Sequence, residues 1–234
     1  MLGDTIMMSS GPTAGPGDIF GDGSNLLTSN FSGSSLASVE GNGSGFSVHT
    51  GAVGYDSNVP RSGFGKSITM TQNVNAQKLS YALQTGATSA DCKAYSFWMY
   101  TTRHDDDDNS VVHVNLSRQS GAAQPAQKMI IYVYDNPYSS GGYTYDYFDR
   151  IATSTWVHMC IVDEGTTMRT YKDGTSLGTH SIGSKQLLYP NSSYCYSLSD
   201  ADARNVLFVT GYRFFNRALT QAEVTTLYNE NPTY

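Results

Sequence analysis

The chain has 234 residues, of which 39% are hydrophobic and only 15% carry a charge, and its formal net charge at pH 7 is −6. This negative balance argues against a nucleic-acid partner, because binding to a phosphate backbone requires a basic surface. No apolar run approaches the roughly 18 residues of a membrane-spanning helix, so we expect no membrane partner either.

The composition favours β-structure. Glycine occurs 23 times and tyrosine 17 times, whereas glutamate, a strong helix former, is rare. Tyrosine and β-branched residues suit pleated surfaces, and all-β sandwiches often run to about 200–250 residues as one domain. We therefore expect a single all-β domain.

Residues 1–17 form the first distinct segment. They are rich in Gly, Pro and Ser without periodicity, which predicts an extended N-terminal arm ahead of a domain at residues 18–234. The arm is either flexible or docks on a neighbouring subunit. The segment lacks the basic start and apolar centre of a secretory signal, so we expect no export by that route if residue 1 is the natural start.

The following segments alternate between apolar and polar residues and are separated by turn-forming clusters, which predicts β-strands. They are Gly45–Thr50, Gly65–Thr71, Lys78–Gln84, Ala94–Thr101, Ser110–Ser117, Met129–Asp135, Trp156–Asp163, Thr167–Lys172 and Asn205–Phe214. Within Trp156–Asp163 both faces carry apolar residues, which indicates a central strand. Asp173-Gly174 is a strong hairpin-turn signal.

Four consecutive aspartates, Asp105 to Asp108, lie between two of these predicted strands. We interpret them as a solvated hairpin turn. Side chains of consecutive residues in an extended chain alternate in direction, so at most two, such as Asp105 and Asp107, could reach one ion. Ca²⁺ needs six to eight oxygen ligands, usually including two or three carboxylates. Calcium held by this pair with help from elsewhere is therefore the alternative, and we expect no other cofactor.

Tyrosines gather between Tyr132 and Asp149, a stretch that we interpret as a loop region. Tyrosine offers a rigid contact area with a polar tip and stacks on sugar rings, so this region is a candidate for ligand recognition or an interface. The alternative is that alternate tyrosines pack on a sheet edge. A second, weaker loop of this character runs from Tyr189 to Tyr196. The candidate residues are Tyr138, Tyr143, Tyr145, Tyr147 and Tyr194.

The segment from Asn216 to Glu230 predicts the one helix of the chain. Thr220 and Glu223 have the spacing of a capping box, and Leu219 and Val224 that of a hydrophobic staple. An apolar stripe follows, and Asn231-Pro232 ends the helix. The stripe consists of Ala222, Val224, Leu227 and Tyr228.

Four stretches carry a family resemblance. In chain order they are Gly63–Ile68, Tyr95–Met99 with its S-F-W core, Trp156–His158 followed by Tyr171–Gly174, and Thr210–Asn229 with N-R-A-L-T-x-x-E-V. Together they resemble the motifs of laminin-G-like, or concanavalin A-like lectin, jelly-roll domains across nearly the whole chain. The resemblance implies an all-β fold: a two-sheet antiparallel jelly-roll sandwich with one short C-terminal helix. It places function in the rim loops, where several members hold calcium, or on the concave sheet.

Catalytic constellations are absent from the sequence. Some relatives of this fold are glycosidases that use paired carboxylates, but their E-x-D-x-x-E pattern is missing, and the adjacent Asp163 and Glu164 would point to opposite faces of a strand. The five histidines show no metal-ligand spacing, and His158 is expected to be a satisfied core residue. We expect no enzymatic activity and no catalytic residues.

The three cysteines have no disulfide or zinc spacing, so we expect buried thiols, with one disulfide and one free thiol as the alternative.

Fold analogy and the missing export signal favour a non-enzymatic surface or structural module of a virion, such as a phage capsid decoration or tail appendage. Its expected partners are other virion proteins or copies of itself, with host glycans as candidate ligands. The alternative is a carbohydrate-binding or adhesion module of a secreted, extracellular protein.

Overall fold

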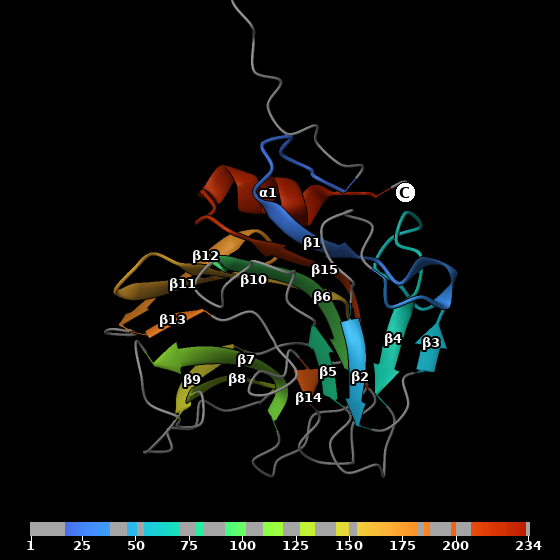
Figure 1. The fold of residues 1–234 in the computed structure, drawn as a ribbon, viewed down its shortest axis with the longest axis horizontal. Helices are drawn as coiled ribbons and strands as arrows, with labels where there is room; N and C mark the ends of the chain where they lie inside the picture. Colours follow the sequence, from blue (N-terminus) through green and yellow to red (C-terminus); the bar gives the residue numbers. More distant parts are fainter. Residues whose placement is uncertain are drawn as a thin grey trace, which may run out of the picture.

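Two layers of β-strands face each other in the computed structural model of the chain (Figure 1). The structure describes residues 17–37, 46–50, 54–70, 78–81, 92–101, 110–118, 127–133, 144–149, 154–181, 185–187, 198–199 and 207–232.

The larger layer is an antiparallel sheet of eight strands. Its order is β12 (Thr175–Ser181), β11 (Thr167–Lys172), β10 (Val157–Asp163), β6 (Ala94–Thr101), β15 (Leu207–Phe215), β4 (Ser67–Met70) and β3 (Gly54–Asp56), and β1 (Asn25–Ser29) also pairs with β15. Strand β10 lies well inside the sheet and all seven of its residues are buried, which confirms the prediction of a central strand.

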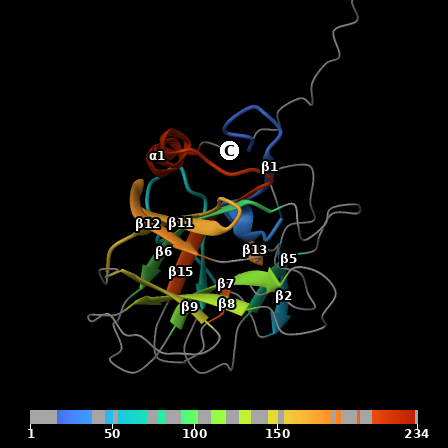
Figure 2. The same cartoon turned by 90° about the vertical axis from the view of Figure 1, so that its left-hand side faces the viewer.

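The second layer consists of two smaller sheets (Figures 1 and 2). One has the order β13 (Lys185–Leu187), β7 (Ser110–Arg118), β8 (Gln127–Val133) and β9 (Thr144–Asp149), and the other β14 (Leu198–Ser199), β5 (Lys78–Tyr81) and β2 (Phe46–Thr50). All pairs are antiparallel except β8 with β9, which is parallel. The two layers confirm the predicted jelly-roll sandwich.

The prediction of a hairpin turn at Asp105–Asp108 is wrong. The strand before this run, β6, pairs with β10 and β15 in the large sheet, whereas the strand after it, β7, pairs with β13 and β8 in the second layer. Residues 102–109 therefore connect the two layers. The sequence pattern could not distinguish the two connections, because both join strands through a polar segment.

The tyrosine-rich region is also not one continuous loop. Residues 127–133 form β8 and residues 144–149 form β9, so its second half is a strand at the end of the four-stranded sheet. Tyr145 and Tyr147 alternate with Thr144 and Asp146, a pattern that is typical of a strand.

Aromatic residues fill the space between the two layers. Phe97 and Tyr212 from the large sheet stack with ring centroids 5.1 Å apart, and Phe46 from β2 meets Tyr212 edge-on at 5.3 Å. Because side chains alternate along a strand, the residues between these inward-pointing ones in β6, β10 and β15 point to the outer face of the large sheet.

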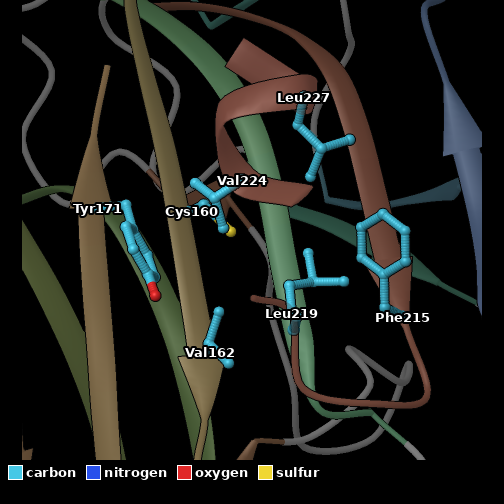
Figure 3. Packing of buried hydrophobic residues seen from close by; sticks show 8 residues of the cluster. Cys160, Val162, Tyr171, Phe215, Leu219, Val224 and Leu227 are labelled. Carbon is cyan, nitrogen blue, oxygen red and sulfur yellow. The ribbon is translucent and has the colours of Figure 1, made fainter. Parts of the chain in front are cut away.

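Helix α1 (Gln221–Asn229) covers part of that outer face (Figure 1). Figure 3 shows its buried side chains pointing toward β10, β11 and β15. The cluster contains Ala94, Cys160, Val162, Tyr171, Phe215, Leu219, Val224 and Leu227. Both the capping box and the burial of Leu219 with Val224 are confirmed. Ala222 is exposed, however, so the buried stripe is narrower than predicted.

A short 3-10 turn, η1 (Ser32–Ser34), follows β1. No helix in the described part of the chain is long and apolar enough to cross a lipid bilayer.

Candidate functional site

Three aromatic side chains form a row across neighbouring strands on the outer face of the large sheet. Tyr100 of β6 lies opposite Phe208 of β15, and Trp156 immediately precedes β10. The Tyr100 ring centroid is 5.6 Å from that of Trp156 and 5.6 Å from that of Phe208. All three side chains are half-buried. We call Trp156, Tyr100 and Phe208 the aromatic row.

The aromatic row lies beyond the part of the sheet that α1 covers. Trp98 precedes Tyr100 by two residues on the same face, and its ring stacks on Tyr228 near the end of α1 at a centroid distance of 5.6 Å. Two residues along a strand correspond to about 7 Å. The row is therefore the first set of outward-facing residues past the end of the helix.

Smaller side chains continue the row toward the edge of the sheet. Thr69 of β4 is opposite Phe208, and Gly54 of β3 is opposite Thr69. A Cβ at position 54 would lie 2.3 Å from the Thr69 hydroxyl, so a side chain there would displace the threonine. The face thus changes from large aromatic rings to small polar groups.

The loop between β3 and β4 fixes the orientation of Trp156. The Trp156 indole Nε1 donates a hydrogen bond of 3.1 Å to Asn58 Oδ1, and the backbone N–H of Asn58 donates to Asp56 at 2.7 Å. The same loop is attached to the C-terminal segment, because the Gly63 N–H donates to the Asn231 side chain at 3.1 Å. An indole held in this way presents a rigid surface to a ligand.

Beneath the covered part of the face lies a buried serine–histidine pair. His158 Nε2 is 2.8 Å from Ser96 Oγ, and both residues are buried. Burial, and secondly the charge of Arg61, lower the pKa of His158 to about 3, so the imidazole is neutral at pH 7. This confirms that His158 is a core residue, although only its Nε2 has a hydrogen-bond partner among the described residues.

The two candidate acids take part in structural contacts. Asp163 is buried and its carboxylate accepts from Lys93 Nζ at 3.0 Å, whereas Glu164 is exposed and pairs with Arg169 at 2.7 Å. Among the residues described, no three His, Cys, Asp or Glu side chains converge as metal ligands.

Cys92 and Cys160 are free and buried, and burial raises the pKa of both thiols. Thiols in this state are unreactive.

The structure places two of the predicted recognition residues. Tyr145 and Tyr147 lie in β9, in register with Met129 and Ile131 of β8. Tyr138, Tyr143 and Tyr194 lie outside the described residues, as do the proposed calcium ligands Asp105 and Asp107, so their roles stay predictions.

Sequence reasoning missed the aromatic row. A signal was present, since Tyr100 and Trp156 are two residues from Trp98 and His158 of the family-like motifs and so share their face. What the sequence could not supply is the strand register that brings the three rings together.

Comparisons with known proteins agree with this architecture. A family model described as the concanavalin A-like lectin/glucanases superfamily matches residues 70–225. A search of curated proteins finds no match.

Among solved structures, domain 4 of an extracellular arabinanase from Geobacillus stearothermophilus, in complex with arabinotriose, is similar with a TM-score of 0.59 and 15% identity, over 88% of this chain and 98% of that one. The binding domain of botulinum neurotoxin serotype G has a TM-score of 0.58 and 16% identity, over 87% of this chain and 50% of its own. The botulinum neurotoxin serotype D ligand-binding domain in complex with N-acetylneuraminic acid has a TM-score of 0.59 and 14% identity, over 88% of this chain and 50% of its own. The chain thus spans about half the length of these toxin domains, and at such identities the likeness concerns the fold.

Proposed function

The chain belongs to the concanavalin A-like lectin/glucanases superfamily, and from that premise we propose that it is a non-enzymatic module that binds glycans. The observation that carries the proposal is the aromatic row. Half-exposed aromatic rings on a rigid strand surface stack on the apolar faces of sugar rings at low conformational cost.

Several features support this assignment over an enzymatic one. The acids that could form a catalytic pair, Asp163 and Glu164, are engaged in separate ion pairs, and His158 is buried and neutral. Polar groups next to the row, such as the Asn58 amide and the Thr69 hydroxyl, could accept and donate hydrogen bonds to sugar hydroxyls. Similar domains solved with arabinotriose and with N-acetylneuraminic acid are consistent with a glycan ligand.

Glycan binding is tested with the two tryptophans as reporters. Trp156 is half-exposed, whereas Trp98 is buried. After a glycan array has identified a ligand, its addition should change tryptophan emission strongly in the native chain and much less in Trp156→Phe, in which only the buried Trp98 remains. Trp156→Ala should lower the affinity by about tenfold or more, as truncation of a central aromatic contact does.

The matched control is Leu177→Ala, which removes an exposed apolar side chain on β12, at the opposite edge of the sheet from β3. This variant should bind as the native chain does. Full binding by Trp156→Ala, or no glycan bound at all, would overturn the proposal.

We further propose a virion surface, such as a capsid decoration or tail appendage, as the setting of the module, packed on other virion proteins or on copies of itself. Support comes from the combination of a β-sandwich with the Gly- and Pro-rich segment at residues 1–17. The alternative, a module of a secreted protein, has support from the extracellular arabinanase domain. Mass spectrometry of purified particles decides between them, since absence of the chain would exclude the virion assignment.

A further inference from the structure

Arg61 is a half-buried cation on the outer face of the large sheet. Its guanidinium carbon lies 5.0 Å from the ring centroid of Trp98 and 5.4 Å from that of Tyr228. Its Nη1 donates a hydrogen bond of 2.7 Å to the backbone carbonyl of Glu230. These three contacts fix the plane and the position of the group.

One edge of this guanidinium has no acceptor in the described part of the chain. Nη1 is used, but Nε and Nη2 make no hydrogen bond there, and no carboxylate among the described residues pairs with Arg61. Other arginines with described side chains each have a carboxylate partner: Arg169 with Glu164, Arg213 with Glu230, and Arg217 with Asp22 and Glu223.

The geometry of the open edge points to a specific kind of ligand group. The Nε–H and Nη2–H bonds of an arginine are parallel and match the two oxygens of a carboxylate. Because the guanidinium is already held by Glu230 and by two rings, little side-chain freedom is lost when an anion binds.

Arg61 and the aromatic row lie on the same outer face of the large sheet. Arg61 lies over Trp98, two residues before Tyr100 on the same face, which is about 7 Å along the strand. Asn58, which holds Trp156, comes from the same loop as Arg61. A sugar ring stacked on Tyr100 or Trp156 would therefore place a substituent within reach of the guanidinium.

We propose that the site selects sugars that carry a carboxylate, with Arg61 binding that group side-on while the aromatic row stacks on the ring. This inference rests on the proposed glycan-binding function and specifies in addition that the glycan carries a negative charge. It also assigns a partner to the edge of Arg61 that has no acceptor in the described part of the chain.

The test compares ligands that differ only in the carboxylate. Trigalacturonic acid and its full methyl ester form one pair, and sialyllactose and its methyl ester form a second. Isothermal titration calorimetry on the full chain should give an affinity about tenfold or more higher for the acid of at least one pair, as expected for a hydrogen-bonded charge. Because the contact is ionic, this preference should weaken as NaCl is raised.

Variants of Arg61 separate charge from geometry. Arg61→Gln should give the acid and its neutral counterpart equal affinity. Arg61→Lys keeps the positive charge but loses the two parallel N–H donors, so it should retain part of the preference for the acid. The control Arg169→Gln removes a half-exposed arginine on β11 and should leave the preference unchanged. Thermal melting of each variant confirms that it is folded.

The outcomes distinguish this inference from the function on which it rests. If neutral glycans bind as well as acidic ones and binding still depends on Trp156, the glycan-binding function stands and the carboxylate preference is wrong. The role of Arg61 is equally wrong if acidic sugars are preferred but Arg61→Gln keeps the preference. If no sugar binds, or if an acidic peptide binds in place of the sugars, both proposals are overturned.

Discussion

His158 shows how a single side chain can make stability depend on pH. The imidazole packs against Trp98 with ring centroids 5.2 Å apart and bonds to Ser96, while its Nδ1 has no hydrogen-bond partner among the described residues. A proton on this ring would place a charge in a buried site near the Arg61 cation. The folded protein therefore disfavours the protonated form, whereas the unfolded chain accepts a proton with an ordinary pKa near 6.5.

The first prediction concerns acid lability. The pKa of His158 is about 3 in the folded protein, which lies below the unfolded value. Between about pH 6.5 and 3 only the unfolded state therefore gains a proton, so the free energy of unfolding decreases as the pH is lowered through this range. From pH 7 to pH 5 the contribution of His158 amounts to about 2 kcal/mol of unfolding free energy. Urea denaturation at pH 7, 6 and 5 measures this loss.

The control for acid lability is His158→Gln, a side chain that does not titrate. This variant should be less stable than the native chain at pH 7 but should lose less stability on acidification. Equal pH slopes for the two proteins would show that His158 is not the responsible group.

The functional residues were predictable from the sequence only in part. The burial of His158 follows from its place between apolar neighbours in a two-sided strand. The aromatic row could not be predicted, because Tyr100, Trp156 and Phe208 are far apart in sequence and meet only through the pairing of β6 with β10 and β15. A local sequence pattern indicates which face of the sheet a side chain lies on and whether it is buried, but it does not indicate the register between paired strands.

At the scale of elements, α1 depends on a few contacts at its first turn. The Glu223 N–H donates to Thr220 Oγ1, and the Glu223 carboxylate accepts from the Thr220 N–H at 2.8 Å. That carboxylate also pairs with Arg217, which holds the pKa of Glu223 below its ordinary value. The helix is only nine residues long, so its stability comes from the cap and from packing on the sheet rather than from length.

We predict that Thr220→Ala lowers the unfolding free energy by about 1 kcal/mol, the usual cost of losing an N-cap. Thr220→Ser keeps the hydroxyl and should be close to neutral. Thr225→Ala, an exposed change within the same helix, should be neutral or slightly stabilising because alanine has the higher helix propensity. Chemical denaturation of the three variants checks this order, and a loss at Thr225 equal to that at Thr220 would contradict the capping argument.

Element types were more predictable than element partners. Each predicted strand segment overlaps a strand of the structure, and the Asp173-Gly174 turn has the positive φ angles, 49° and 75°, of a tight hairpin. The short strands β1, β3, β13 and β14 were not predicted, nor was β9, which was interpreted as a loop, nor β12, whose Ser, Thr and Gly content gives a weak signal. The assignment of β7 to the second layer was missed as well, because it depends on packing across the sandwich.

At the scale of the whole molecule, a buried ion pair joins parts of the chain that are far apart in sequence. Arg213 of β15 binds the Glu230 carboxylate just after α1, and it also donates to the Gly17 carbonyl and to Thr28 of β1. Arg213 is 2% exposed. A guanidinium in this environment depends on its partners, because it has lost its water.

We therefore predict that Glu230→Ala lowers the unfolding free energy by about 3 kcal/mol or more, since it leaves Arg213 buried without its carboxylate. Replacement of the whole pair, in Arg213→Met with Glu230→Leu, should recover part of this loss. The matched control is Glu164→Ala, which breaks the ion pair of this exposed residue with Arg169 and should leave the unfolding midpoint nearly unchanged. Guanidinium chloride interferes with ionic contacts, so urea is the appropriate denaturant. Equal losses in the two alanine variants would mean that the pair contributes no more than a surface contact, and that packing alone joins the chain ends to the sheet.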